Sequence, residues 1–230
     1  MTIVANPGRN TAMTPTLRRT AARIAALAAL ALATNARAQP ASVPRAPDAA
    51  LDVLSAQDRE VLAAAEQLAN DATQLLEQWI ISNAITEERL FARLYYPIAK
   101  TDPRKAGPQQ FATPYTALAD RDLAGPEDKA LARIALLQYA ILTDINGYVP
   151  VHNTRFAQPL TGNSEQDFIN NRTKRMLGDN ASLAAARSEA RFLIQRVKVE
   201  SGDVIYDLSV PVNVRGKHWG CARIGYRRAE

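Results

Sequence analysis

Two histidines, His152 and His218, are the only imidazoles in the chain, so metal binding and catalysis are the first chemistries to consider. Zinc needs three or four nitrogen or sulfur ligands, and the chain has a single cysteine. Asp144 or Asp207 can add a carboxylate, but the spacing does not require it. His152, Asp144 and Ser209 are the residue types of a hydrolase triad, yet no nucleophile elbow or glycine-rich oxyanion loop accompanies them. The sequence therefore predicts no metal site, no cofactor and no enzymatic activity.

Two arginines are the stronger binding residues. Arg172 and Arg175 lie three positions apart in NRTKRM, which puts them on one face of a helix predicted for residues 165–177. A pair of guanidinium groups suits bidentate binding of a carboxylate or a phosphate. The alternatives are a fold-stabilising network with a nearby aspartate (Asp167, Asp179 or Asp203) and plain solvent exposure.

The histidines and their neighbours complete the predicted site. His152 ends a predicted strand, where its ring can hydrogen-bond to backbone or ligand, and Tyr148 and Asn153 flank it. His218 and Trp219 are predicted to point to opposite faces of the last strand. A structural role for His218, satisfied by backbone, is the alternative to a pocket role. The predicted ligand-binding set is Arg172, Arg175, His152, Asn153, Tyr148 and His218.

The charge distribution excludes a polyanion partner. The net charge is +5, but residues 1–38 contain five arginines and no acidic residue. Subtracting these five from the 28 basic residues leaves 23, which equals the 23 acidic residues. The rest of the chain is neutral, so no nucleic-acid binding is predicted.

The first 38 residues have the pattern of a secretory signal. Arg18, Arg19 and Arg23 precede the apolar run IAALAALALA (24–33), and Ala36-Arg37-Ala38 is a cleavage sequence. An uncleaved anchor is the alternative, but the run is short of the ~20 residues that span a bilayer. Met1 and Met13 both remain open as the start. Residues 1–38 are thus a predicted signal peptide, and the mature protein is predicted to be periplasmic or secreted, without membrane insertion.

The elements that must position the site follow from periodicity. Residues 39–53 read as a linker and 54–230 as a single domain. Ser55 is a predicted N-cap, with Asp58 three positions on, for a long amphipathic helix over 55–83. Its apolar stripe can pack on the protein's own sheet or form a seam with a homodimer partner or a membrane receptor. Short helices and loops are expected over 84–133, where prolines are frequent.

The second half predicts an antiparallel sheet. Residues 135–144 and YVPVHN read as a hairpin around Asn146-Gly147. Three strands follow near the C-terminus, the middle one with Val204, Tyr206, Leu208, Val210, Val212 and Val214 on one core face, and Pro211 predicts a bulge. Cys221 is predicted to be buried in the last strand. The expected fold is α+β, with a long helix packed on an antiparallel sheet and helices over one face.

Five sequence blocks, in order, resemble a known family. PQQFATPYTALAD, DINGYVPVHNTRFAQPLTG, NRTKRMLGD, DLSVPVNV and GKHWGCARIGY are similar to the extracytoplasmic Cache-like, PAS-related sensory domain of bacterial methyl-accepting chemotaxis proteins. The resemblance implies a ligand pocket between the sheet and the helices packed over it. Those receptors continue into a membrane segment and a coiled coil, whereas this sequence stops at Glu230. The expectation is a sensor domain without its signalling module. The haem that some such sensors carry requires CxxCH, which is absent.

These observations predict a non-enzymatic periplasmic sensory domain that binds a small organic anion. The alternative is a protein-interaction module of the same fold that binds no ligand and uses helix 55–83 to dimerise or to dock on a membrane receptor.

Overall fold

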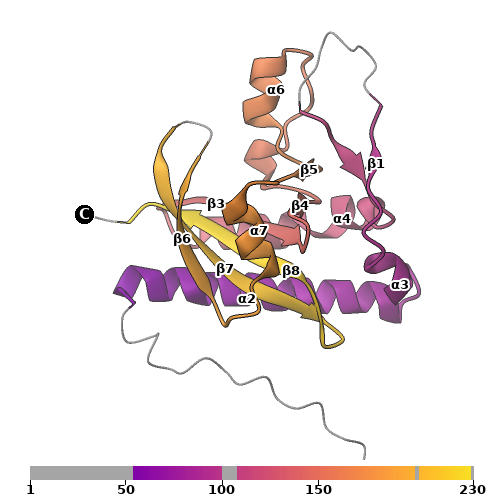
Figure 1. The fold of residues 1–230 in the computed structure, drawn as a ribbon, viewed down its shortest axis with the longest axis horizontal. Helices are drawn as coiled ribbons and strands as arrows, with labels where there is room; N and C mark the ends of the chain where they lie inside the picture. The colour runs from indigo at the N-terminus through magenta and orange to yellow at the C-terminus, as the bar shows by residue number, and fades with distance from the viewer. Residues whose placement is uncertain (1–53, 100–107, 200–201, 229–230) are drawn as a thin grey trace, which may run out of the picture. The chain divides into compact units, whose positions relative to one another are not determined.

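The chain folds as an α+β structure in which a long helix packs against a four-stranded antiparallel sheet (Figure 1). The computed structural model describes residues 54–99, 108–199 and 202–228. The predicted fold class is confirmed. The predicted signal peptide (1–38) and linker (39–53) lie outside the described residues and stay predictions, as does the assignment of 54–230 to one Cache-like domain.

Helix α2 (Ala56–Ile81) begins where the sequence predicts. Ser55 Oγ accepts a hydrogen bond from the Asp58 amide (3.0 Å), and Asp58 Oδ2 accepts one from the Ser55 amide (3.3 Å). The apolar stripe of the helix packs on strands β7 (Val204–Val214) and β8 (Lys217–Tyr226). Each fully buried leucine in the stripe stabilises the fold by about 1.5–3 kcal/mol. The stripe is therefore used within the chain.

The four-stranded sheet has the order β3-β8-β7-β6, with β3 spanning Leu137–Asp144 and β6 spanning Leu193–Lys198. The last three strands form the predicted antiparallel meander. The register shifts between Val212 and Asn213, one residue after the predicted bulge at Pro211. Pro211 lies beyond the last residue of β7 that pairs with β6, so β7 has a strand neighbour on one side there. A proline is tolerated at such a position because no second ladder needs its missing N–H.

Both faces of the sheet are covered by helices, one face being apolar and the other carrying polar residues. Leu208, Val210 and Val212 of β7 lie on the face that packs against α2, as predicted, whereas Val204 at the strand's start is 54% exposed. The opposite face lies under helix α7 (Asn180–Arg187), whose Ala185 and Ala186 pack on the buried Cys221 (Figure 1). Alternation along the strands places polar residues on this second face.

The predicted hairpin at Asn146-Gly147 is wrong, although a turn is present. Strand β3 pairs with β8 along its length, and the chain then leaves the sheet so that β4 (Tyr148–Val149) pairs with β5 (Arg175–Met176). Asp144 Oδ1 accepts hydrogen bonds from the amides of Asn146 (2.9 Å) and Tyr148 (3.1 Å), which redirects the chain. Gly147 has φ +78°, and a Cβ there would lie 2.3 Å from the Leu177 carbonyl oxygen.

The helix predicted for 165–177 is also wrong in its second half. Helix α6 covers Ser164–Asn170, and the backbone is extended at Asn171 and left-handed at Lys174 (φ +59°). The Arg175 guanidinium folds back on the helix end, where Nη2 donates to the carbonyls of Asp167 (3.2 Å), Phe168 (2.6 Å) and Asn171. Arg175 therefore caps the helix and is not part of it.

The remaining segment combines predicted and unpredicted elements. The short helices expected over 84–133 are α3 (Glu87–Leu90), α4 (Thr116–Asp122) and α5 (Ala124–Ala132). A small pair of strands, β1 (Tyr96–Pro97) and β2 (Phe111–Ala112), lies in the same segment, and helix α7 was not predicted. None of the helices in the described part of the chain combines the length and apolarity needed to cross a membrane.

Candidate functional site

A cavity of about 490 Å³ lies on the face of the sheet that carries α7. Its floor comes from the sheet, with Tyr139 and Ile141 of β3 and Arg223 of β8. Residues 196–199 at the end of β6 form one side, and the start of α7 forms another. The chain around β4 and β5 supplies His152, Arg172 and Arg175. This volume is in the range that protein pockets use for small molecules, ~300–1,000 Å³.

A buried ion pair organises the floor. Arg223 Nε donates to Asp207 Oδ2 (2.9 Å), and Arg223 Nη2 donates to the same oxygen. Both residues are almost fully buried, and they lie diagonally across the adjacent strands β7 and β8, where Asp207 pairs with Gly225 and Arg223 with Ser209. Burial lowers the pKa of the Arg223 guanidinium, but the Asp207 carboxylate outweighs it and holds that pKa above its ordinary value. The guanidinium thus stays charged. Its Nη1, also buried, has no hydrogen-bond partner among the described residues.

Tyr139 is fixed on the same floor by a glycine. Tyr139 pairs with Gly225 across β3 and β8, and a Cβ on Gly225 would lie 2.3 Å from Tyr139 Cε1. The phenol ring can therefore lie flat over the strand only because position 225 has no side chain. Burial, followed by the Asp207 carboxylate, raises the pKa of Tyr139 well above its ordinary value, so the phenol is neutral.

His152 is a neutral imidazole in the cavity wall. Its ring lies edge-on to Phe156 (centroids 5.1 Å apart) and to Tyr139 (6.3 Å). Burial, together with the positive charges of Arg172, Arg155 and Arg175, lowers its pKa to about 3. Its Nδ1 is buried without a hydrogen-bond partner in the described residues. The ring can therefore offer a polar atom to a ligand but no charge.

Arg172 and Arg175 both reach the cavity, but they lie after the end of α6 and not on one helix face as predicted. The Arg172 guanidinium stacks over the Phe156 ring (4.1 Å from Cζ to the centroid), and its Nε donates to the Ile169 carbonyl (2.9 Å). Arg175 caps α6 and lies 4.9 Å from the Phe168 ring centroid. Both residues line the cavity.

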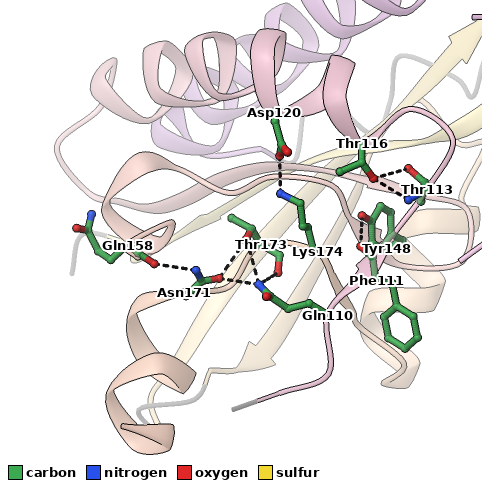
Figure 2. A network of polar contacts seen from close by, with 10 residues as sticks. All are labelled: Gln110, Phe111, Thr113, Thr116, Asp120, Tyr148, Gln158, Asn171, Thr173 and Lys174. Carbon is green, nitrogen blue, oxygen red and sulfur yellow. Dashed lines mark hydrogen bonds and ion pairs between the residues drawn. The ribbon is translucent and has the colours of Figure 1, made fainter. Parts of the chain in front are cut away.

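A polar network anchors the segment that carries these arginines (Figure 2). Gln110 Nε2 donates to Asn171 Oδ1 (3.0 Å) and to the Thr173 carbonyl (3.0 Å), and Asn171 Nδ2 donates to the Gln158 carbonyl (2.7 Å). Lys174, which points away from the Gln110 contacts in Figure 2, pairs with Asp120 on α4. Residues on both sides of Arg172 are therefore tied to other elements, which pre-organises the cavity wall.

Three predicted site residues have fold-stabilising contacts and do not line this cavity. Tyr148 is fully buried, and its hydroxyl donates to the Phe111 carbonyl (2.7 Å; Figure 2). Asn153 Oδ1 accepts from the Ala140 amide (2.8 Å) at the outer edge of β3. His218 Nε2 lies 2.8 Å from the Ala186 carbonyl oxygen on α7, while Trp219 on the other face is buried. Their predicted ligand contacts find no support in the geometry, because core packing and backbone contacts already occupy these side chains.

Three cationic lining residues were missed by the sequence reading. Arg196 and Lys198 are exposed residues near the end of β6, and Arg223 lies inside the apolar run of β8. A charge inside an apolar strand is a signal for a buried ion pair, and this signal was available for Arg223. With Arg172 and Arg175, five cationic side chains line the cavity against one carboxylate, Asp179. Asp179 is engaged at the start of α7, where it accepts from the Ser182 amide (2.9 Å).

The residue types considered for catalysis are not assembled. Asp144 is buried in a separate cluster, where its Oδ2 accepts from the Tyr95 hydroxyl (2.5 Å). Burial raises the pKa of Asp144, against the hydrogen bonds from Tyr95 and the backbone. Neither Asp144 nor Ser209 lines the cavity with His152. Within the described residues, no group of three or more histidine, cysteine or acidic side chains is placed to hold a metal ion.

Comparisons with known proteins assign no family. No protein-family model matches the sequence, and no curated protein matches it. Among solved structures, the chain is similar to an extracellular ligand-binding receptor from Desulfohalobium retbaense DSM5692, with 13% sequence identity and a TM-score of 0.34. The similarity covers 76% of this chain and 26% of the receptor chain. Function therefore has to be inferred from the cavity itself.

Proposed function

We propose that the protein is a sensory domain that binds a small organic anion in the cavity between the sheet and α7. The observation that carries this proposal is the charge of the lining: five cations, of which Arg223 is paired with the buried Asp207, and a single carboxylate around about 490 Å³. At an effective dielectric constant of ~20, one charge pair at 4 Å is worth about 4 kcal/mol before desolvation costs. Clustered cations repel one another, so a bound anion relieves this repulsion in addition to forming ion pairs and hydrogen bonds.

The Cache-like assignment and the export of the protein are parts of the same proposal. The five sequence blocks that resemble chemoreceptor sensory domains support the first, and the leader-like residues 1–38 support the second. A cavity between the sheet and α7 agrees with the pocket that this resemblance implies, and it supports the proposal. A catalytic role has less support, because His152 lines the cavity without Asp144 or Ser209, the acid and the nucleophile of the hydrolase triad.

The alternative, an interaction module that uses the stripe of α2, is less well supported. That stripe packs on β7 and β8, so it is covered before any partner arrives. A partner would have to use the polar side of the helix.

The test compares two charge-removing double variants. Arg196→Gln/Lys198→Gln removes two exposed cations from the cavity, and Arg215→Gln/Lys217→Gln removes two from the β7–β8 turn, where they pair with Glu87. Glutarate, valerate and phosphate are each titrated into both variants and the wild type, and affinity is measured by calorimetry. We expect at least one anion to bind and its affinity to fall about tenfold or more in the cavity variant, a loss of 1.4 kcal/mol or more.

The turn variant should bind as the wild type does. Equal losses of affinity in the two variants would mean that anion binding depends only on the net charge of the protein. No binding of any anion to the wild type would contradict the proposed function.

A further inference from the structure

The cationic residues of the cavity differ in depth. Arg196 and Lys198 are exposed and lie at the end of edge strand β6, so they stand at the mouth. Arg223 lies on the central strand β8 and is 3% exposed, so it stands at the floor. An elongated ligand that enters with its acid group at the mouth would present its other end to Arg223.

The floor guanidinium is prepared for a contact that the protein does not make. Asp207 Oδ2 takes both Nε and Nη2 of Arg223, which fixes the plane of the guanidinium. The remaining nitrogen, Nη1, is buried and has no partner within the described chain. A buried donor without a partner is costly, so its presence calls for an explanation such as a bound water, ion or ligand. Because Asp207 already balances the charge, the floor requires an acceptor oxygen, which can be neutral or anionic.

A second polar atom of the cavity wall is also without a partner. His152 Nδ1 is buried in the cavity wall, also without a hydrogen-bond partner in the described residues. The Tyr139 ring lies beside His152 (6.3 Å between centroids), and Ile141 is paired with Arg223 in the sheet. The inner part of the cavity therefore combines an aromatic and aliphatic surface with two polar atoms. This suits the carbon chain of an acid followed by an oxygen function.

From this arrangement we infer that the ligand is an organic acid with a second oxygen acceptor remote from its acid group, and that Arg223, held by Asp207, selects for that second group. The inference rests on the proposed function and names the ligand class for the same cavity. It makes Arg223 the specificity-determining residue, with the mouth cations supplying charge attraction.

Three acids with the same five-carbon chain test the inference. Valerate has no second oxygen function, levulinate has a ketone at carbon 4, and glutarate has a second carboxylate. Calorimetry on the wild type should give affinities for levulinate and glutarate at least about tenfold above that for valerate, since an unmatched buried donor is left in the valerate complex.

A double variant tests the contribution of the cavity floor alone. Asp207→Leu/Arg223→Met replaces the buried pair by apolar side chains of similar size, a change that proteins often tolerate without loss of stability. Its melting temperature reports its fold. We expect the glutarate-to-valerate affinity ratio to fall to near one. If this variant fails to fold, Arg223→Lys keeps a cation for Asp207, loses the second fork of the guanidinium, and should reduce the same ratio.

The outcomes separate the two proposals. Equal affinities for the three acids, all weakened by Arg196→Gln/Lys198→Gln, would leave the proposed function standing and overturn the role of Arg223. A preference for glutarate that survives in the floor variant would also overturn it. No binding by any of the three acids would contradict both.

Discussion

His152 illustrates how the environment changes the chemistry of a single residue. A free imidazole titrates near neutral pH, but burial and neighbouring arginines lower the pKa of His152 to about 3. The ring therefore stays neutral wherever the protein is expected to work. The cavity consequently has a polar, uncharged wall beside its arginines, and the positive charge of the site comes from arginine and lysine alone.

This shifted pKa has a consequence for stability. Between pH 6.5, the ordinary pKa of histidine, and about pH 3, the unfolded chain binds a proton at His152 and the folded chain does not. The free energy of unfolding should therefore fall as the pH falls through this window. We expect His152→Gln to remove this dependence, so that wild type loses about 1 kcal/mol per pH unit more than the variant.

The measurement is urea denaturation of both proteins at several pH values from 7 to 4. Other titrating groups, including Asp144, whose pKa burial raises, are common to both proteins and cancel in the difference. Parallel curves for the two proteins would contradict the assigned burial of His152.

At the scale of elements, the outer edge of β3 is protected by side chains instead of another strand. Glu127 Oε1 on α5 accepts from the Leu142 amide (3.0 Å), and Asn153 Oδ1 accepts from the Ala140 amide (2.8 Å). Both acceptors are fully buried. They satisfy amides that an edge strand would otherwise leave open to pairing with another chain. Asn153 is thus a structural residue of the sheet edge.

Glu127 provides a test of this edge. Burial raises the pKa of Glu127 well above its ordinary value, against the hydrogen bond from Leu142. The carboxyl is therefore most stabilising when protonated, and its contribution is lost as the pH rises above 4.5. We expect Glu127→Gln, which keeps an acceptor without a charge, to gain stability relative to wild type as the pH rises from 5 to 8.

The matched control is Glu127→Ala. It leaves the Leu142 amide without its acceptor and should cost about 1–3 kcal/mol in urea denaturation at any pH in this range. A Gln variant as unstable as the Ala variant would show that the edge requires the carboxylate charge.

Elements also show what the sequence could and could not predict. The capping box at Ser55, the stripe of α2 and the three-strand meander follow from local periodicity, and all are present. The hairpin at Asn146-Gly147 failed because Asp144 and the distant strand β8 decide where the chain goes. The helix predicted over 165–177 ends at Asn170, because the backbone is extended at Asn171 and the Arg175 guanidinium caps the end of α6.

At the scale of the whole molecule, the site is a product of long-range pairing. Arg223 meets Asp207 only because β7 and β8 are adjacent, and Arg196 and Lys198 join them from β6 at the edge. No spacing within the sequence places these residues around one cavity. The predicted pair Arg172 and Arg175 does line the cavity, but both residues lie beyond the end of α6 and not on a shared helix face. Residue types were therefore a better guide to the site than the predicted helix was.

The two histidines offer the most direct measurement. His152 lines the cavity, whereas His218 lies against α7 outside its lining, so the chain contains its own internal control. Imidazole resonances of ¹⁵N-histidine-labelled protein are followed during titration with glutarate, valerate and phosphate at constant pH and ionic strength. We expect a saturable shift of the His152 resonances with at least one anion, and a much smaller change at His218. If no anion moves His152 saturably, or if only His218 responds, the cavity is not the anion site.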